Sequence, residues 1–169
     1  MSLRLILMRH AKSSWKHEGL RDHERPLNKR GRRDAPRIAA RLLELGWSPD
    51  AVVSSDSQRT RETWARMSDT FPDAPVRFEP ALYHAGLGEL RASAAGWSPD
   101  WSCVLVLGHN PGWEEALAWL ARSEEVMTTG NAALLRGEGT DWAGALQGDW
   151  TLLELLRPRE PTRGATTGA

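Results

Sequence analysis

The sequence predicts a single α/β domain, a three-layer α/β/α sandwich around a mainly parallel central sheet. Its 169 residues match the ~100–200 residues of one domain. Short, almost continuous apolar runs indicate strands that are buried on both faces. Segments with apolar residues every three to four positions lie between these runs, which is the alternation of βαβ units. We expect this domain to span residues 1–157.

The predicted strands follow in chain order. The strongest are residues 3–8, 51–54 and 103–107, the weaker candidates are 76–78 and 134–136, and 150–156 closes the series. The remaining segment, 158–169, is polar, small and proline-containing, so we expect a disordered tail.

Four helices are predicted between these strands. Ile38, Leu42 and their apolar neighbours mark one helical face that ends at Gly46, and Asn28 is a candidate for its N-terminal cap. Pro36 leaves two alternatives, because a proline inside a helix removes a hydrogen bond. Either the helix begins near Asp34, or it is longer and bent at Pro36. Of the other three helices, one is expected to begin at about residue 57, and the other two are expected to span 86–94 and 113–121.

Composition excludes several classes of protein. The 22 Lys and Arg residues balance 22 Asp and Glu residues, so the excess positive charge of a general nucleic-acid binder is missing. No apolar run approaches the ~18 residues that cross a bilayer, and the run 5–8 lacks the features of a signal peptide. The single cysteine, Cys103, excludes an internal disulfide and a cysteine-based zinc site. We therefore expect a cytoplasmic protein without nucleic-acid or membrane partners.

Unusual polar residues follow three of the predicted strands. They are Arg9-His10-Ala11-Lys12-Ser13-Ser14, then residues 54–61 with Arg59, and then Gly108-His109-Asn110-Pro111-Gly112. Each segment alone is also typical of a surface loop, a helix cap or a turn. Because ligands of open α/β sheets bind beyond the carboxyl ends of the strands, we expect His10, Arg59 and His109 to converge.

This set of side chains suits phosphate better than a metal. Two histidines and two arginines without a carboxylate cluster make a poor zinc site, since zinc normally takes a third protein ligand. Guanidinium groups match phosphate oxygens in pairs. We therefore expect an anion site without metal or cofactor.

At these residues the chain resembles the histidine phosphatase (phosphoglycerate mutase-like) superfamily. The first block is similar to its Arg-His-(Gly/Ala) signature, and residues 108–112 are similar to its second catalytic histidine motif. Residues 22–31, with Arg25-Pro26-Leu27-Asn28, resemble a block of the SixA-type phosphohistidine phosphatases, and residues 54–63 resemble the family's Ser-x-x-x-Arg segment. The resemblance spans residues 3–156 and leaves no room for a large inserted subdomain, which indicates the SixA-type branch and a phosphoglycerate mutase-like fold.

The resemblance implies a role for each matching residue. His10 is the implied nucleophile, and Arg9, Arg59 and a protonated His109 bind the phosphoryl group. Arg25 is expected to add a substrate contact, or else to be a loop residue fixed by the following proline. Lys12, Ser13 and Ser14 line the same loop and are further candidates for substrate binding.

One departure from the wider superfamily bears on the substrate. Phosphomonoesterases of the family carry a carboxylate general acid after the next strand, but residues 80–88 contain no Asp or Glu. An imidazole leaving group needs less acid help than an alkoxide, so phosphohistidine on a protein is the expected substrate. The alternatives are a phosphatase of a small phosphorylated metabolite, with Glu79, Glu89 or His84 as the acid, and a binding module without turnover.

Overall fold

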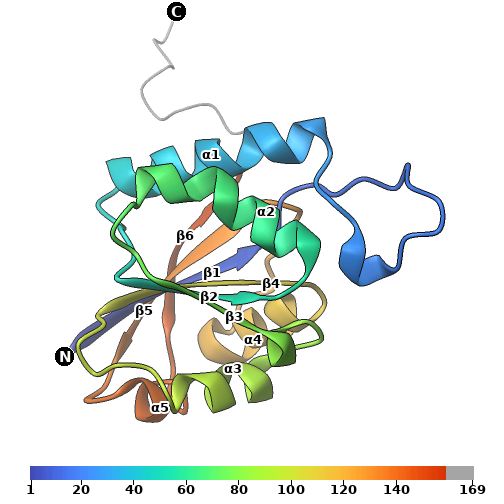
Figure 1. Cartoon of the computed structure of the whole chain (residues 1–169). Helices are drawn as coiled ribbons and strands as arrows, with labels where there is room; N and C mark the ends of the chain where they lie inside the picture. Colours follow the sequence, from blue (N-terminus) through green and yellow to red (C-terminus); the bar gives the residue numbers. More distant parts are fainter. Residues whose placement is uncertain (159–169) are drawn as a thin grey trace, which may run out of the picture.

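The computed structural model describes residues 1–158, which form a six-stranded sheet flanked by helices (Figure 1). The strand order is β3-β2-β4-β1-β5-β6. The strands span β1 Ser2–Arg9, β2 Ala51–Ser55, β3 Val76–Glu79, β4 Cys103–Gly108, β5 Ala132–Glu138 and β6 Thr151–Leu156. The first four strands run parallel, β5 is antiparallel to β1, and β6 is antiparallel to β5. The predicted α/β fold with a mainly parallel sheet is confirmed.

Helices cover both faces of this sheet (Figure 1). The α-helices are α1 Lys29–Glu44, α2 Gln58–Met67, α3 Leu87–Ala94, α4 Gly112–Ala121 and α5 Trp142–Ala145. Three short 3-10 turns, η1 Asp22–Glu24, η2 Ser68–Thr70 and η3 Pro80–Leu82, lie in the connections. The four predicted helices are present, whereas α5 has only four residues and escaped a prediction based on periodicity.

Alternating side chains of the strands build two separate cores. On β1, Leu5 and Leu7 face one core with Trp113 and Leu117 of α4. Ile6 and its alternate neighbour Met8 face the other core, which α1 and α2 cover. Because successive side chains of a strand point to opposite faces, one apolar run serves both cores.

Helix α1 begins early and continues through its proline. The Asn28 side chain accepts a hydrogen bond from the Gly31 amide at 2.9 Å, as a capping residue does. Pro36 lies inside the helix on its exposed side, where water can satisfy the carbonyl that loses its partner. Of the two sequence-based alternatives, the longer helix is therefore the correct one.

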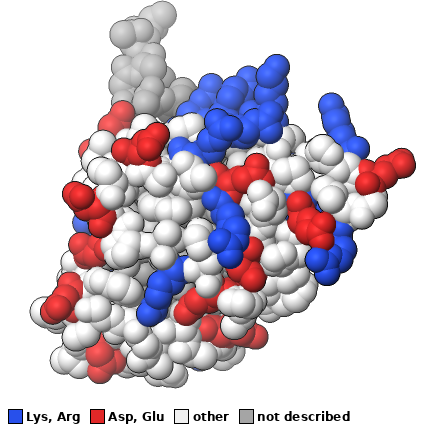
Figure 2. Space-filling model, in the orientation of Figure 1, with Lys and Arg blue, Asp and Glu red and all other residues white. Residues whose placement is uncertain are grey.

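Charge is unevenly distributed although the net charge is zero. Figure 2 shows Lys and Arg gathered over α1, with acidic residues spread across the rest of this face. The helix carries Lys29, Arg30, Arg32, Arg33, Arg37 and Arg41. Within residues 1–158, no helix is long and apolar enough to span a membrane. The predicted tail lies almost wholly outside these described residues.

Candidate active site

The register of the sheet brings the polar segments to one edge. Arg9 and Gly108 are paired at the ends of β1 and β4, and the His10 amide donates to the Gly108 carbonyl at 3.1 Å. β2 lies on the other side of β4 and ends at Ser55. The rings of His10 and His109 are consequently 5.2 Å apart between centroids. The structure thus brings together side chains that lie about a hundred residues apart in the sequence.

The His10 ring is held with one nitrogen unprotonated. Its Nδ1 lies 2.7 Å from the Ala11 carbonyl oxygen, which can only accept, so the hydrogen-bond pattern assigns the proton to Nδ1. Nε2 then carries the lone pair. Burial lowers the pKa of His10 to about 3, and the charges of Arg59, Arg9 and Arg25 act in the same direction against the hydrogen bond to Ala11. The imidazole is therefore neutral at neutral pH.

Arg59 lies beside this nitrogen at the start of α2. Ser57 caps the helix by accepting from the Thr60 amide, and this places Arg59 in the first turn, facing inward and buried. Its Nε donates to His10 Nε2 at 3.3 Å. The alternative of a solvated residue in the first turn is excluded by this burial.

His109 faces the same space from the end of β4. Its Nε2 lies 2.8 Å from the Ser55 hydroxyl, and its buried Nδ1 has no partner. Burial lowers the pKa of His109 to about 2, helped by the proximity of His10 and Arg59. His109 is therefore neutral in this structure, and its protonation beside a phosphoryl group stays a prediction. A dianionic phosphoryl group beside the ring would raise its pKa, since an opposite charge favours the cation.

Arg9 approaches the histidines from the face of the sheet that α4 covers. Its Nη1 donates to the Met127 carbonyl at 3.0 Å, while its buried Nε has no partner. Burial and Arg59 lower the pKa of Arg9, and Glu114 of α4 opposes them. An arginine with an unused buried donor next to His10 has spare capacity for an anion.

Arg25 is clamped by the serines that were expected to contact substrate. Its Nη2 donates to the Ser13 hydroxyl at 2.6 Å and its Nε to the Ser14 carbonyl at 3.1 Å. The exposed Trp15 ring covers its guanidinium at 3.2 Å. These contacts bury the Arg25 guanidinium and fix its orientation within the loop, and a substrate contact by Arg25 stays a prediction.

Lys12 contributes through its backbone. Its carbonyl accepts from the Asn28 amide at 3.0 Å, and a Cβ on Gly31 would lie only 2.2 Å from the same oxygen. Glycine at position 31 therefore allows the loop after β1 to lie directly against the start of α1. A substrate contact by the Lys12 side chain stays a prediction.

Two site residues lacked an assigned role in the sequence analysis. Asp22 and Tyr83 lie on different connections, yet the Tyr83 hydroxyl donates to Asp22 Oδ2. The Tyr83 ring also meets the His109 ring edge-on at 5.3 Å. Asp22 stands three residues before Arg25 in the motif block. That spacing was the only feature of the sequence that could have indicated a role for Asp22 in the site.

A small pocket opens beside His109. Its volume is about 180 Å³, and its lining includes Tyr83, His84, Asn110 and Glu115. The two candidate acids of the sequence analysis are engaged elsewhere. Glu79 accepts a hydrogen bond from Ser93 at 2.6 Å, and Glu89 accepts one from the Gly86 amide at 3.0 Å, where α3 begins. Neither Glu79 nor Glu89 lines this pocket.

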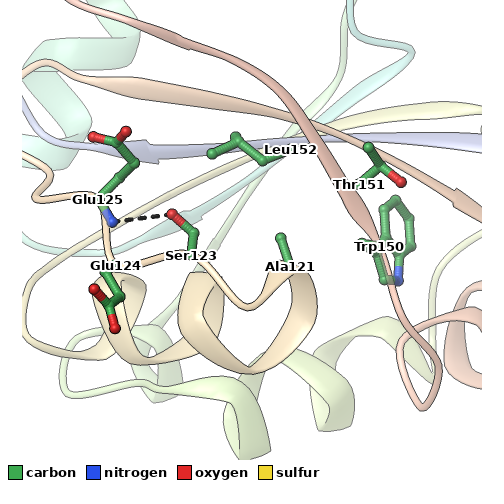
Figure 3. A pocket seen from close by; sticks show the side chains of 7 residues that line it. All are labelled: Ala121, Ser123, Glu124, Glu125, Trp150, Thr151 and Leu152. Atoms are coloured by element: carbon green, nitrogen blue, oxygen red, sulfur yellow. Dashed lines mark hydrogen bonds between the residues drawn. The ribbon is translucent and has the colours of Figure 1, made fainter.

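A larger hollow of about 590 Å³ lies elsewhere, between the end of α4 and β6 (Figure 3). Glu124 and Glu125 line it together with Trp150, and Ser123 accepts from the Glu125 amide. No arginine or histidine contributes to this hollow, so it does not suit a phosphoryl group. Within residues 1–158, no group of three or more His, Cys, Asp or Glu side chains is arranged to hold a metal ion.

Comparison with known proteins assigns the chain to a family. A model of the histidine phosphatase superfamily (branch 1) matches residues 5–127. The chain belongs to the histidine phosphatase superfamily. A chloroplastic protein of Arabidopsis thaliana is 42% identical to it over 172 residues, which cover 94% of this chain and 79% of the plant protein. Since that relative is chloroplastic, the cytoplasmic location of this histidine phosphatase stays a prediction.

Solved structures of SixA proteins share its fold. A candidate phosphohistidine phosphatase SixA from Nakamurella multipartitia superposes with a TM-score of 0.83 at 30% identity, covering 95% of this chain and 98% of its own. A second, from Agrobacterium tumefaciens, gives 0.79 at 26% identity, with 92% and 98% covered. The resemblance stated from the motifs is confirmed. Family and neighbours together support a phosphatase acting on a phosphorylated substrate.

Proposed function

We propose that this protein is a metal-independent phosphatase that removes phosphoryl groups from phosphohistidine on a protein, through a covalent intermediate on His10. The observation that carries the proposal is the state of the His10 ring. Its Nδ1 proton is directed to the Ala11 carbonyl, and its pKa of about 3 leaves Nε2 unprotonated next to the Arg59 guanidinium. A neutral nitrogen with a lone pair beside a fixed cation is what attack on phosphorus requires.

The proposed reaction has two steps. The lone pair of His10 Nε2 forms a bond to phosphorus while the bond to the leaving group breaks and its electron pair goes to that group. Arg9, Arg59 and Arg25 offset charge on the equatorial oxygens. His109 takes up a proton as the dianion arrives, and it then stands where it can pass that proton to the leaving group. Water attacks the phosphohistidine in the second step, which frees His10 and inorganic phosphate.

The nature of the leaving group favours phosphohistidine. Glu79 and Glu89, the nearest carboxylates in sequence to the position of the family's general acid, are engaged at α3. A leaving imidazole can take its proton from His109 or solvent, whereas an alkoxide depends on a positioned acid that supplies about 10²–10⁴ in rate. The similarity to the SixA neighbours supports the same substrate class.

A second candidate is a phosphatase of a small metabolite, and the pocket beside His109 favours it. His84 and the exposed Glu115 carboxylate line that pocket, so either could serve as an acid for a compact leaving group. The two candidates differ in how strongly the rate depends on the leaving group.

Trapping the intermediate tests the chemistry. Wild-type protein mixed with ³²P-labelled phosphohistidine protein in EDTA and then quenched should carry base-stable, acid-labile label. His10→Ala should carry none while remaining folded by circular dichroism, because the ring is at a strand end and outside both apolar cores. Absence of label on the wild type, or its appearance only after a divalent ion is added, would contradict the proposal.

A substrate panel separates the two candidates. We expect kcat/KM for a phosphohistidine peptide and for nitrophenyl phosphate to exceed that for glycerol phosphate by at least about 10²-fold. Brisk hydrolysis of glycerol phosphate that is lost in Glu115→Gln or His84→Gln would instead establish the small-metabolite phosphatase.

A further inference from the structure

The Asp22 carboxylate bridges the two arginines on the outer side of the site. Its Oδ1 accepts from Arg25 Nη1 at 2.9 Å and its Oδ2 from Arg59 Nη2 at 3.0 Å. The Tyr83 hydroxyl donates to the same Oδ2. Two oxygens of one anion thus receive donors from two guanidinium groups, which is the way a phosphoryl group binds between arginines.

Each nitrogen of the Arg59 guanidinium donates a hydrogen bond, and two of these three bonds go to Asp22. Nε donates to His10, Nη1 to the Asp22 carbonyl at 2.7 Å and Nη2 to the Asp22 carboxylate. Arg25 is similarly occupied, with Nε and Nη2 on Ser14 and Ser13 and Nη1 on Asp22. A phosphoryl group that takes the donors now directed at the Asp22 carboxylate must therefore replace that carboxylate.

We propose that Asp22 is a specificity-determining residue, an internal anion that competes with the phosphoryl group for Arg25 and Arg59. The inference rests on the proposed function, which assigns these arginines to phosphoryl binding. A dianionic phosphoryl group offers more charge and more oxygens than a carboxylate and displaces it, whereas a carboxylate ligand or a singly charged anion does not. Asp22 thereby restricts the site to strongly charged groups.

The exposed position of Asp22 lets a phosphoryl group replace its carboxylate at a small cost in free energy. Its side chain is 52% exposed, and the three-residue turn η1 that carries it contains no buried residue. The turn belongs to the long connection between β1 and α1, which stands out from the body of the molecule (Figure 1). Moving the carboxylate therefore exposes little apolar surface.

Asp22 also carries its charge at neutral pH. Burial alone would raise its pKa, but the hydrogen bonds from Tyr83 and Arg59 and the charge of Arg59 outweigh this and lower the pKa. The competing anion is consequently present throughout the neutral pH range. The opposite role, a carboxylate that merely positions the arginines for substrate, predicts the opposite effect of its removal.

Phosphate binding decides between these roles. Isothermal titration with inorganic phosphate at fixed ionic strength measures Kd for the wild type and for Asp22→Asn. We expect binding to Asp22→Asn to be about tenfold tighter, since the arginine donors no longer need to be freed from a charged partner; partial exposure limits the gain. Glu24→Gln is the matched control, because it removes the same charge from the same turn but disrupts only a pair with the exposed Arg21. It should bind phosphate as the wild type does.

Two further variants keep the test decisive. Tyr83→Phe keeps the ring, removes the third hydrogen bond to the Asp22 carboxylate and should tighten phosphate binding to a smaller extent. In Asp22→Ala, acetate should compete with phosphate by occupying the place of the lost carboxylate, whereas in the wild type it should not.

Weaker or unchanged phosphate binding in Asp22→Asn would overturn the proposal, and so would equal tightening in Glu24→Gln. Because binding is measured without turnover, failure of the proposed function appears separately, as a missing phosphoenzyme in a protein that still binds phosphate.

Discussion

Arg59 shows how much of the chemistry depends on the shape of one side chain. Its planar guanidinium uses Nε on His10 and both terminal nitrogens on Asp22. A lysine at the same position would retain the charge but could not direct donors along three fixed lines. At the scale of the residue, therefore, we expect the geometry of the side chain to matter in addition to its charge.

We predict that Arg59→Lys lowers kcat/KM by at least about tenfold, which corresponds to about 1.4 kcal/mol of transition-state stabilisation. The measurement is steady-state kinetics with nitrophenyl phosphate. Arg61→Lys is the control on the same helix, since that exposed arginine contacts only the Asp56 carbonyl and the Phe78 ring. Wild-type kinetics in Arg59→Lys would exclude a bidentate role in phosphoryl binding.

At the scale of elements, the close approach of two connections shapes the space beside His109. Gly112 begins α4, and a Cβ built on it would lie 1.7 Å from the Ala85 carbonyl oxygen. The loop that contains Ala85 also carries Tyr83 and His84, so the missing side chain of Gly112 lets β4 and β3 present their residues to one pocket.

We predict that Gly112→Ala separates these connections. The free energy of unfolding should fall by about 1–3 kcal/mol, the usual cost of forcing extra atoms into a packed place, and kcat/KM should fall with it. Denaturant unfolding and kinetics provide the measurements. Gly88→Ala in α3 is the matched control, because nothing lies within 4 Å of its added Cβ. A fully active and stable Gly112→Ala protein would show that the two loops adjust without consequence.

At the scale of the whole molecule, two buried histidines of the site make the stability of the fold depend on pH. His10 and His109 are both buried, with pKa values lowered to about 3 and about 2 from the ordinary value of 6.5. Between those values and 6.5 the unfolded chain binds more protons than the folded protein. Stability is therefore fully present above pH 6.5 and is lost as the pH falls below it.

We predict that acidification from pH 6.5 to pH 5 lowers the free energy of unfolding by about 1–2 kcal/mol for each of the two histidines. Urea unfolding at a series of pH values measures the slope. His109→Gln should reduce that slope, whereas the exposed His17→Gln serves as the control variant and should not. A slope that is the same in His109→Gln and the wild type would mean that His109 is not held neutral by the fold.

The sequence by itself determined the properties that are local along the chain. Apolar runs and their lengths specified the strands, and Asn28 specified the start of α1. His10 and His109 come directly after strands and Arg59 four residues after one, and these positions specified one edge of the sheet. The four motif blocks were sufficient to indicate the family that the comparison confirmed. The short helix α5 and the correct alternative at Pro36 needed the structure, because four residues give no period and a proline's effect depends on which side of a helix meets water.

Only the tertiary structure decided the charge state and the hydrogen-bond partners of the site. The pKa of His109 depends on burial and on charges contributed by distant segments, so only the fold shows that its ring is neutral in this structure. The bridge from Asp22 to Arg25 and Arg59 joins residues up to 37 positions apart, and Tyr83 reaches it from 61 positions away. Such contacts form where separate connections lie against one another beyond the sheet, so a pattern of neighbouring residues in the sequence does not predict them.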